Sequence, residues 1–179
     1  MNKDFILTPE LCFLWHLSRE YKDEENLDAE VHVDENVFKA SKFLLCIGSP
    51  VIKAAFAHNT ERPNTLIIDN FEVKIVEQFL LFLHTGNLTL DYQNFDLLFP
   101  IADFFDVFPL RVVCVKSMHD NLNADNAMKY YAVADKFNVC GLKMNASKVF
   151  QKSITIKNFH DRYKFAISNG YAEFEEILG

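Results

Sequence analysis

The sequence predicts an α+β fold, with a small sheet near the N-terminal end and a cluster of helices after it. Three observations predict this class: two short strands flank a turn in residues 30–40, helical spacing of apolar residues dominates from residue 72 onward, and half of the 179 residues are hydrophobic. Burying one of the 18 phenylalanines is worth roughly 1.5–3 kcal/mol, so a large core needs neither disulfides nor metal. This length suits one ordinary domain, alone or with a small appendage.

The formal net charge of −7 and the acidic run between residues 23 and 35 argue against partners that are themselves negatively charged. Proteins that bind phosphate backbones usually carry a basic stripe, so we expect neither direct nucleic-acid binding nor attachment to an anionic membrane. A solvated loop and strand edge explains the acidic run better than a dedicated site for a basic partner.

The four cysteines, Cys12, Cys46, Cys114 and Cys140, lie far apart and form no Cys-x-x-Cys pair. The chain begins without a secretion signal, and no apolar run approaches the roughly 20 residues that a membrane helix needs. We therefore expect reduced, buried thiols and residence in the cytoplasm, the nucleus or both.

The first predicted element is a helix that begins with Thr8 as cap and Pro9 at its first position. Leu11, Leu14 and Trp15 then follow at helical spacing and give the helix one apolar face. This helix precedes any sheet that it could cross, so its apolar face must find a core or a partner.

Two strands are expected at residues 30–33 and 36–40, around an Asp34-Glu35 turn. Two helical segments, 41–45 and 50–56, are separated by Gly48 and Ser49, and residues 65–68 form a third strand. A helix starting at Glu72 carries a wide apolar face to Thr85-Gly86, which implies burial between other helices.

Helices fill the rest of the chain, and Pro100 should kink or shorten the first of them because it lacks a backbone donor. They are expected at residues 95–105, 109–121, 126–137, 142–151, 159–168 and 172–178. The segments 126–137 and 142–151 suggest an antiparallel pair joined by residues 138–141.

Seven stretches together resemble the BTB/POZ family, and in particular its speckle-type branch. They are Leu14-Trp15 with Ser18-Arg19, Ser49-Pro50-Val51 with Phe56, Phe82-Leu83-His84-Thr85-Gly86, Ala102-Asp103-Phe104-Phe105, Leu110-Arg111-Val112-Val113-Cys114, Asn121-Leu122-Asn123-Ala124-Asp125-Asn126-Ala127, and residues 132–142. Phe104 stands where this branch usually has lysine. The last stretch resembles the first helix pair of a BACK domain, and the match covers roughly residues 8–152. No MATH domain, kelch repeat or zinc finger is evident.

The resemblance implies three parts: an N-terminal dimerisation helix with an acidic loop (1–27), a BTB/POZ domain with a small mixed sheet and a helix cluster (28–121), and a helical BACK-like extension (122–179). It implies a protein–protein interaction adaptor, a dimer that delivers substrates to a cullin-based ubiquitin ligase. The partners would be a second copy or another BTB protein, a cullin and a client protein. The alternative is an oligomerisation scaffold of a transcriptional, chromatin or other complex without cullin.

The resemblance also assigns two sets of site residues. The dimer interface would include Leu11, Leu14, Trp15, Asp28 and Gly48, although packing of the first three within one subunit remains an alternative. Gly48 stands where the branch usually has the basic partner of the aspartate. The cullin-facing candidates are Phe56, Thr60, Glu61, Arg62 and His84, where the branch usually has a hydrophobic-x-Glu motif and a tyrosine.

No residue pattern indicates catalysis, a metal or a cofactor. The segment around Gly48-Ser49 lacks a nucleophile elbow, and no glycine-rich phosphate loop is present. His119-Asp120 has no nucleophile nearby in the sequence, and Asp103 with Asp106 is a common kind of acidic surface pair. We expect a protein that is not an enzyme.

Overall fold

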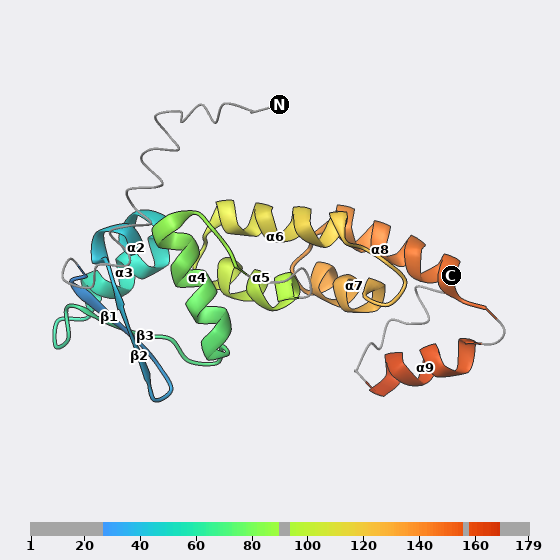
Figure 1. Ribbon diagram of the computed structural model, residues 1–179, viewed down its shortest axis with the longest axis horizontal. Coiled ribbons are helices and arrows are strands. Elements are labelled where there is room, and N and C mark those ends of the chain that lie inside the picture. Colours follow the sequence, from blue (N-terminus) through green and yellow to red (C-terminus); the bar gives the residue numbers. More distant parts are fainter. Residues whose placement is uncertain (1–26, 90–93, 156–157, 169–179) are drawn as a thin grey trace, which may run out of the picture. The chain divides into compact units, whose positions relative to one another are not determined.

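A computed structural model describes residues 27–89, 94–155 and 158–168. The chain divides into two compact units, Met1–Asp91 with Leu97–Arg111, and Tyr92–Asp96 with Val112–Gly179. Within the described ranges the elements confirm the predicted α+β class, with a small mixed sheet followed by helices (Figure 1).

The sheet of the first unit has the strand order β2-β1-β3. Strand β1 (Ala29–Val33) pairs antiparallel with β2 (Asn36–Ala40) and parallel with β3 (Thr65–Ile67). Ala29, Val31 and Val33 are buried, whereas the side chains between them are half-exposed, so β1 has one core face and one solvent face.

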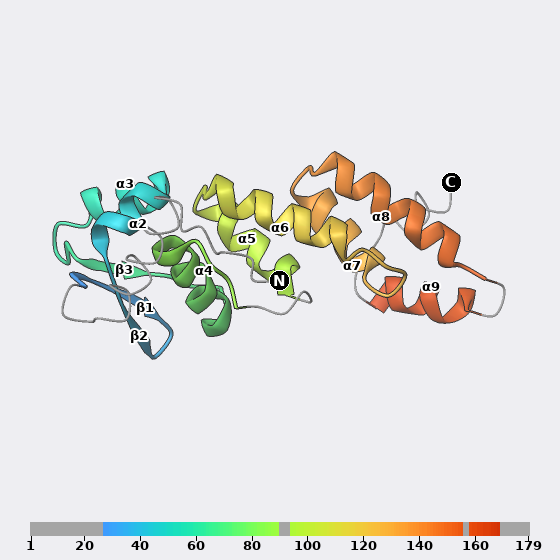
Figure 2. The ribbon, with the colours of Figure 1, turned by 45° about the horizontal axis from the view of Figure 1, so that its top comes forward.

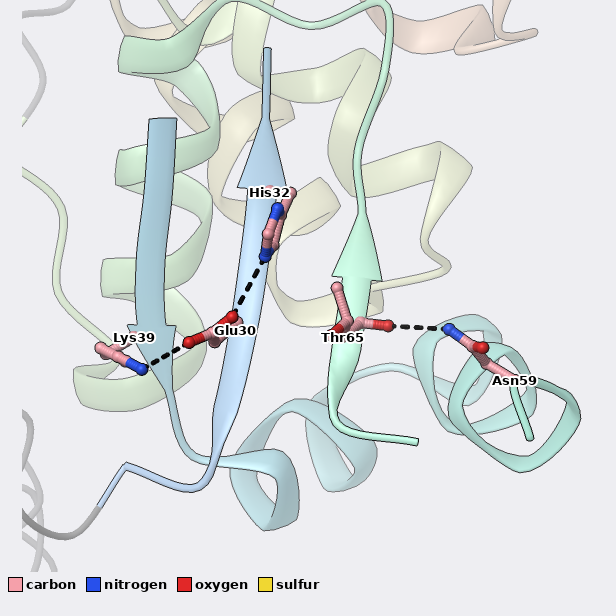
Figure 3. A network of polar contacts seen from close by, with 5 residues as sticks. All are labelled: Glu30, His32, Lys39, Asn59 and Thr65. Carbon is pink, nitrogen blue, oxygen red and sulfur yellow. Dashed lines mark hydrogen bonds and ion pairs between the residues drawn. The ribbon is translucent and has the colours of Figure 1, made fainter. Parts of the chain in front are cut away.

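Charged side chains join the strands on the solvent face, as Figure 3 shows. Glu30 lies between Lys39 on β2 and His32 on its own strand, with Lys39 Nζ 2.6 Å and His32 Nε2 3.2 Å from its two carboxylate oxygens. The hydrogen bond from Lys39, followed by the one from His32, lowers the pKa of the Glu30 carboxyl. These exposed contacts fix side-chain positions more than they add stability.

Two short helices connect the sheet strands β2 and β3, and each begins at a serine. Ser41 caps α2 (Lys42–Gly48), and Ser49 caps α3 (Pro50–His58), in which Pro50 occupies the first position. Serine is a common cap at the start of a helix, and proline is common at the first position, so the starts of both helices agree with these sequence preferences. Figure 2 shows this helical hairpin beside the sheet.

Ser49 is fully buried and has two hydrogen-bonding roles. Its Oγ accepts a 3.0 Å hydrogen bond from the Ile52 N–H and donates a 2.6 Å hydrogen bond to the Phe105 carbonyl. The Phe105 ring in turn packs on Phe79 of α4, with 5.2 Å between ring centroids. The Ser-Pro pair therefore joins α3 to the turn that follows α5.

Helix α4 (Val73–Thr85) packs against α2 and β2 with buried side chains that include Val76, Phe79 and Leu80. It ends at Gly86, whose φ of 69° is the left-handed conformation that glycine adopts readily. This wide buried face agrees with the apolar pattern of the sequence.

Helices α5 (Phe95–Phe104) and α6 (Phe108–Asp120) follow, and α5 continues through Pro100. Within the first unit, the turn between them places Asp106 at a φ of 51°. Arg111 closes this turn, because its two terminal nitrogens lie 2.9 Å from Asp103 Oδ1 and 2.9 Å from Asp106 Oδ1.

The second unit contains an antiparallel helix pair, α7 (Ala127–Lys136) and α8 (Cys140–Ser153), and then α9 (Phe159–Ser168). Figure 2 shows α7 and α8 side by side, and they have buried side chains such as Tyr130 and Phe150. The pair was predicted, but α8 starts two residues earlier than expected, so Cys140 and Gly141 belong to the helix rather than to the connection.

Asp96 is a buried carboxylate of the second unit, with Lys129 Nζ 2.9 Å from its Oδ2. Burial, and then the nearby Asp96 charge, raise the pKa of the Cys114 thiol to about 12. The same two causes raise the pKa of Tyr130. Cys114 is therefore a protonated core residue. The expectation of buried thiols holds for Cys114 but is wrong for Cys140, which is exposed, while Cys46 is half-buried.

Two predicted helices, the one that begins at Thr8 and the one at residues 172–178, lie outside the described residues. Among the residues that the structure describes, no helix is long and apolar enough to cross a membrane. Within the same ranges, no group of three or more His, Cys, Asp or Glu side chains is arranged to hold a metal ion.

Replacing Ser49 by alanine should lower the free energy of unfolding by about 2 kcal/mol. The change removes the cap of α3 and leaves the buried Phe105 carbonyl without its donor. Urea unfolding followed by circular dichroism measures the loss. Ser41→Ala is the matched control and should cost about 0.5 kcal/mol, because the Ser41 Oγ bond to the Leu44 N–H is longer, at 3.5 Å. Equal losses in the two variants would contradict the double role of Ser49.

Candidate protein-interaction site

Three side chains satisfy the free N–H groups at the start of α2. His84 Nε2 accepts a 2.9 Å hydrogen bond from the Ser41 N–H, and Asp28 Oδ1 accepts one of 2.7 Å from the Lys42 N–H. The Ser41 hydroxyl accepts the third, from the Leu44 N–H. A helix start otherwise leaves these donors unpaired. Two predicted interface residues, one before β1 and one at the end of α4, thus meet at the same helix end.

His84 is almost fully buried, and both of its ring nitrogens have backbone partners. Its Nδ1–H donates a 2.7 Å hydrogen bond to the Leu80 carbonyl, so the Nε2 that accepts from Ser41 carries no proton. Burial lowers the pKa of this imidazole, and the bond to Leu80 opposes that effect only partly. His84 therefore holds α2 to α4 in its neutral form.

Asp28 is exposed, and its partner is a backbone N–H rather than a basic side chain. The side chain of Lys42 turns away from Asp28 to the Pro63 carbonyl and to Asn64 Oδ1, which lies 2.9 Å from its Nζ. The same ammonium group lies 5.0 Å from the centroid of the Phe56 ring. Phe56 belongs to the core, with only 6% of its surface exposed.

Gly48 lies at the opposite end of α2 from the Asp28 contact. A Cβ atom there would come within 2.5 Å of Leu83 Cδ2, so any larger residue requires the Leu83 side chain to move. The glycine thus allows α2 to approach α4 closely. A longer side chain at position 48 would therefore displace Leu83 from its place against α2.

The surface of α2 presents two large apolar side chains that the sequence analysis did not select. Phe43 is 68% exposed and Ile47 is 67% exposed, and their i, i+4 spacing places them on one face. Leu45, between them, is fully buried. The spacing of Phe43, Leu45 and Ile47 in the sequence is consistent with this arrangement. It identifies the exposed face only when the bounds of this short helix are known.

The loop after α3 presents the remaining candidates, Thr60, Glu61 and Arg62, which are all exposed. Asn59 anchors this loop, because its Oδ1 accepts the Arg62 N–H at 3.1 Å and its Nδ2 donates to the Thr65 carbonyl at 3.1 Å. Figure 3 shows the second contact between α3 and β3. The loop therefore holds an exposed carboxylate, Glu61, without an apolar neighbour in the sequence.

The structure thus separates the predicted site residues into groups. Leu11, Leu14 and Trp15 lie outside the described residues. Asp28 and His84 cap α2, and Phe56 is part of the core. The loop residues 60–62 remain exposed, and their role at a cullin surface stays a prediction.

The unfolding free energy should decrease as the pH falls below about 6.5, because the unfolded chain takes up a proton on His84 that the folded chain resists. The contribution is fully present above pH 6.5, the ordinary pKa, and is lost toward the lower folded-state pKa. The slope from this residue is at most about 1.4 kcal/mol per pH unit.

Urea unfolding at several pH values measures this slope, and His84→Leu isolates it from the other histidines. The variant should be less stable at pH 7.5, yet its stability should depend less on pH. An unchanged pH dependence in His84→Leu would show that the imidazole does not need to be neutral.

Comparison with known proteins supports this architecture. The BTB/POZ domain family matches residues 17–122. The BTB domain of human Gigaxonin is 15% identical, with a TM-score of 0.54 over 65% of this chain and 98% of that one. The BTB domain of zebrafish PATZ1 is 19% identical, with a TM-score of 0.54 over 68% of this chain and 100% of that one. The chain therefore belongs to the BTB/POZ family, whose domains mediate protein–protein interaction and oligomerisation.

Proposed function

We propose that the protein is a dimeric protein–protein adaptor whose self-interface includes the exposed face of α2. The observation that carries the proposal is the exposure of Phe43 and Ile47, each about two-thirds open to solvent on a helix of seven residues. Large apolar side chains gathered on one surface are typical of a protein-interaction site.

The predicted N-terminal helix supplies a matching surface. Its apolar residues Leu11, Leu14 and Trp15 need a partner face, and two copies related by a twofold axis can each offer the α2 face to the other. Burial of such residues is favourable at roughly 25 cal/mol per Å² of apolar surface. In this arrangement Gly48 serves the interface indirectly, because it sets the position of α2 on α4.

The wild-type chain should therefore have twice its mass of 20.7 kDa in multi-angle light scattering. The double variant Phe43→Asp with Ile47→Asp should raise the dimer dissociation constant by at least about tenfold, because it places carboxylates in an apolar contact. Leu14→Asp with Trp15→Ala should have the same effect from the other side of the contact.

Ile67→Asp is the matched control, because Ile67 is 56% exposed on the solvent face of β3. It should leave the dimer mass unchanged. A monomeric wild-type chain would contradict the dimer. A dimer that persists in both α2 and N-terminal variants would place the self-interface elsewhere.

Recruitment of a cullin is the second candidate function, and it is favoured by the exposed, anchored loop that carries Glu61. The α7–α8 pair adds support, because it agrees with the helix pair that resembles the start of a BACK domain. Such a dimer would be a substrate adaptor of a ubiquitin ligase. Without a cullin, the same dimer would serve as a scaffold of a transcriptional, chromatin or other complex, alone or with another BTB protein.

Calorimetry with the N-terminal domain of the third cullin tests this role. We expect binding that Glu61→Lys weakens by about tenfold, since it reverses the exposed charge of the loop. Glu35→Lys, at the exposed β1–β2 turn, is the control and should bind like the wild type. Absence of binding at tens of micromolar by the wild-type chain would contradict the cullin role and leave the scaffold role.

A further inference from the structure

Two exposed phenylalanines frame the α5–α6 turn of the first unit. Phe104 is 63% exposed and Phe108 is 65% exposed. Phe105 and Val107, which lie between them in the sequence, are buried. The apolar side chains of the turn therefore face solvent at Phe104 and Phe108 and the core at Phe105 and Val107. Neither exposed ring contributes to the Ser49 contact that fixes this turn.

The Phe104 ring is held in place despite its exposure. Its centroid lies 5.9 Å from that of Phe71 and 4.9 Å from that of the buried Phe105, in edge-to-face contacts with both. Phe105 continues the row of rings to Phe79 in the core. An aromatic side chain fixed in this way loses little conformational freedom when a partner covers it.

The charges beside the rings are mostly negative. Asp103 and Asp106 both bind Arg111, so these three side chains carry a net charge of −1. The guanidinium of Arg111 also lies over the Phe108 ring, 5.8 Å from its centroid. The guanidinium of Arg111 thus interacts with two carboxylates and one aromatic ring at the same time. Glu72, next to Phe71, adds a further exposed carboxylate.

We propose that Phe104, Phe108 and the half-buried Phe71 form a docking surface for a basic amphipathic segment of a partner protein. The apolar side chains of that segment would cover the two exposed rings, and its lysines or arginines would lie near Asp103, Asp106 and Glu72. Charge complementarity decides the class of partner. Arg111 balances only one of the two aspartate charges, and Glu72 adds a further carboxylate, so an acidic segment would meet a surface with a net negative charge. The net charge of −7 on the whole chain favours the encounter with a basic partner. This surface requires neither the proposed dimer nor a cullin.

A peptide pair tests the proposal with the full chain. The probe is a fluorescein-labelled helical peptide of roughly 14 residues, with leucines on one face and lysines on the other. Its twin has glutamates in place of the lysines. In fluorescence anisotropy the lysine peptide should bind the wild-type chain, and Phe104→Ala should weaken binding by about tenfold. The glutamate peptide should not bind.

Two further variants separate the docking surface from general attraction to an acidic protein. Phe104→Lys should abolish binding, whereas Val37→Lys adds the same charge at a 52% exposed apolar position on β2 and should bind nearly like the wild type. Circular dichroism verifies that each variant is folded. Amide shifts in nitrogen-15 spectra should appear around residues 71, 104, 108 and 111.

Three results would overturn the proposal: equal binding of the two peptides, unchanged binding in Phe104→Ala, or shifts confined to other parts of the chain. A fourth is self-association through this surface, which would appear in light scattering as a loss of mass in Phe104→Lys. In that case the occupant would be a second copy of the chain rather than a basic segment.

Discussion

The buried hydroxyl of Ser49 is the contact on which the rest of the first unit depends. It ends the α2–α3 connection, caps α3 and holds the Phe105 carbonyl of a turn 56 residues away in the sequence. Through Phe105 it also positions the row of rings that runs from Phe79 to Phe104. One side chain thereby places both the helical hairpin and the aromatic surface, and proline at the next position removes a competing backbone donor.

The start of α2 is the second constraint. Two residues that were expected at interfaces, His84 and Asp28, have a structural role there. His84 and Asp28 reach the same helix end from α4 and from the segment before β1. Because their polar atoms satisfy backbone donors, a change at either position acts first on the placement of α2. The exposed Phe43 and Ile47 are displayed by that helix. A substitution of His84 or Asp28 that affects assembly would therefore act on the interface through the position of α2.

The sequence was sufficient to predict the order and type of the described elements, because caps, breakers and apolar spacing are local signals. Strand β2 and helix α9 have the bounds that were predicted. The sequence was insufficient to predict which polar groups pair with each other. The hydrogen bonds between Ser49 and Phe105 and between Ser41 and His84 join residues that are 56 and 43 positions apart. A histidine near a helix end indicates neither burial nor tautomer. The role of Gly48 likewise depends on Leu83, which no local pattern connects with it.

Within this fold, Gly48, His84 and Phe104 belong to two physical classes. Gly48 and His84 act inside the structure, because the glycine makes room for Leu83 and the imidazole takes backbone partners. Phe104 faces solvent, although its ring is apolar. Packing compensates for an unusual residue inside the protein, whereas an exposed ring has a cost in water that folding does not recover. An exposed aromatic position is therefore a better place than a buried one to search for a partner of this chain.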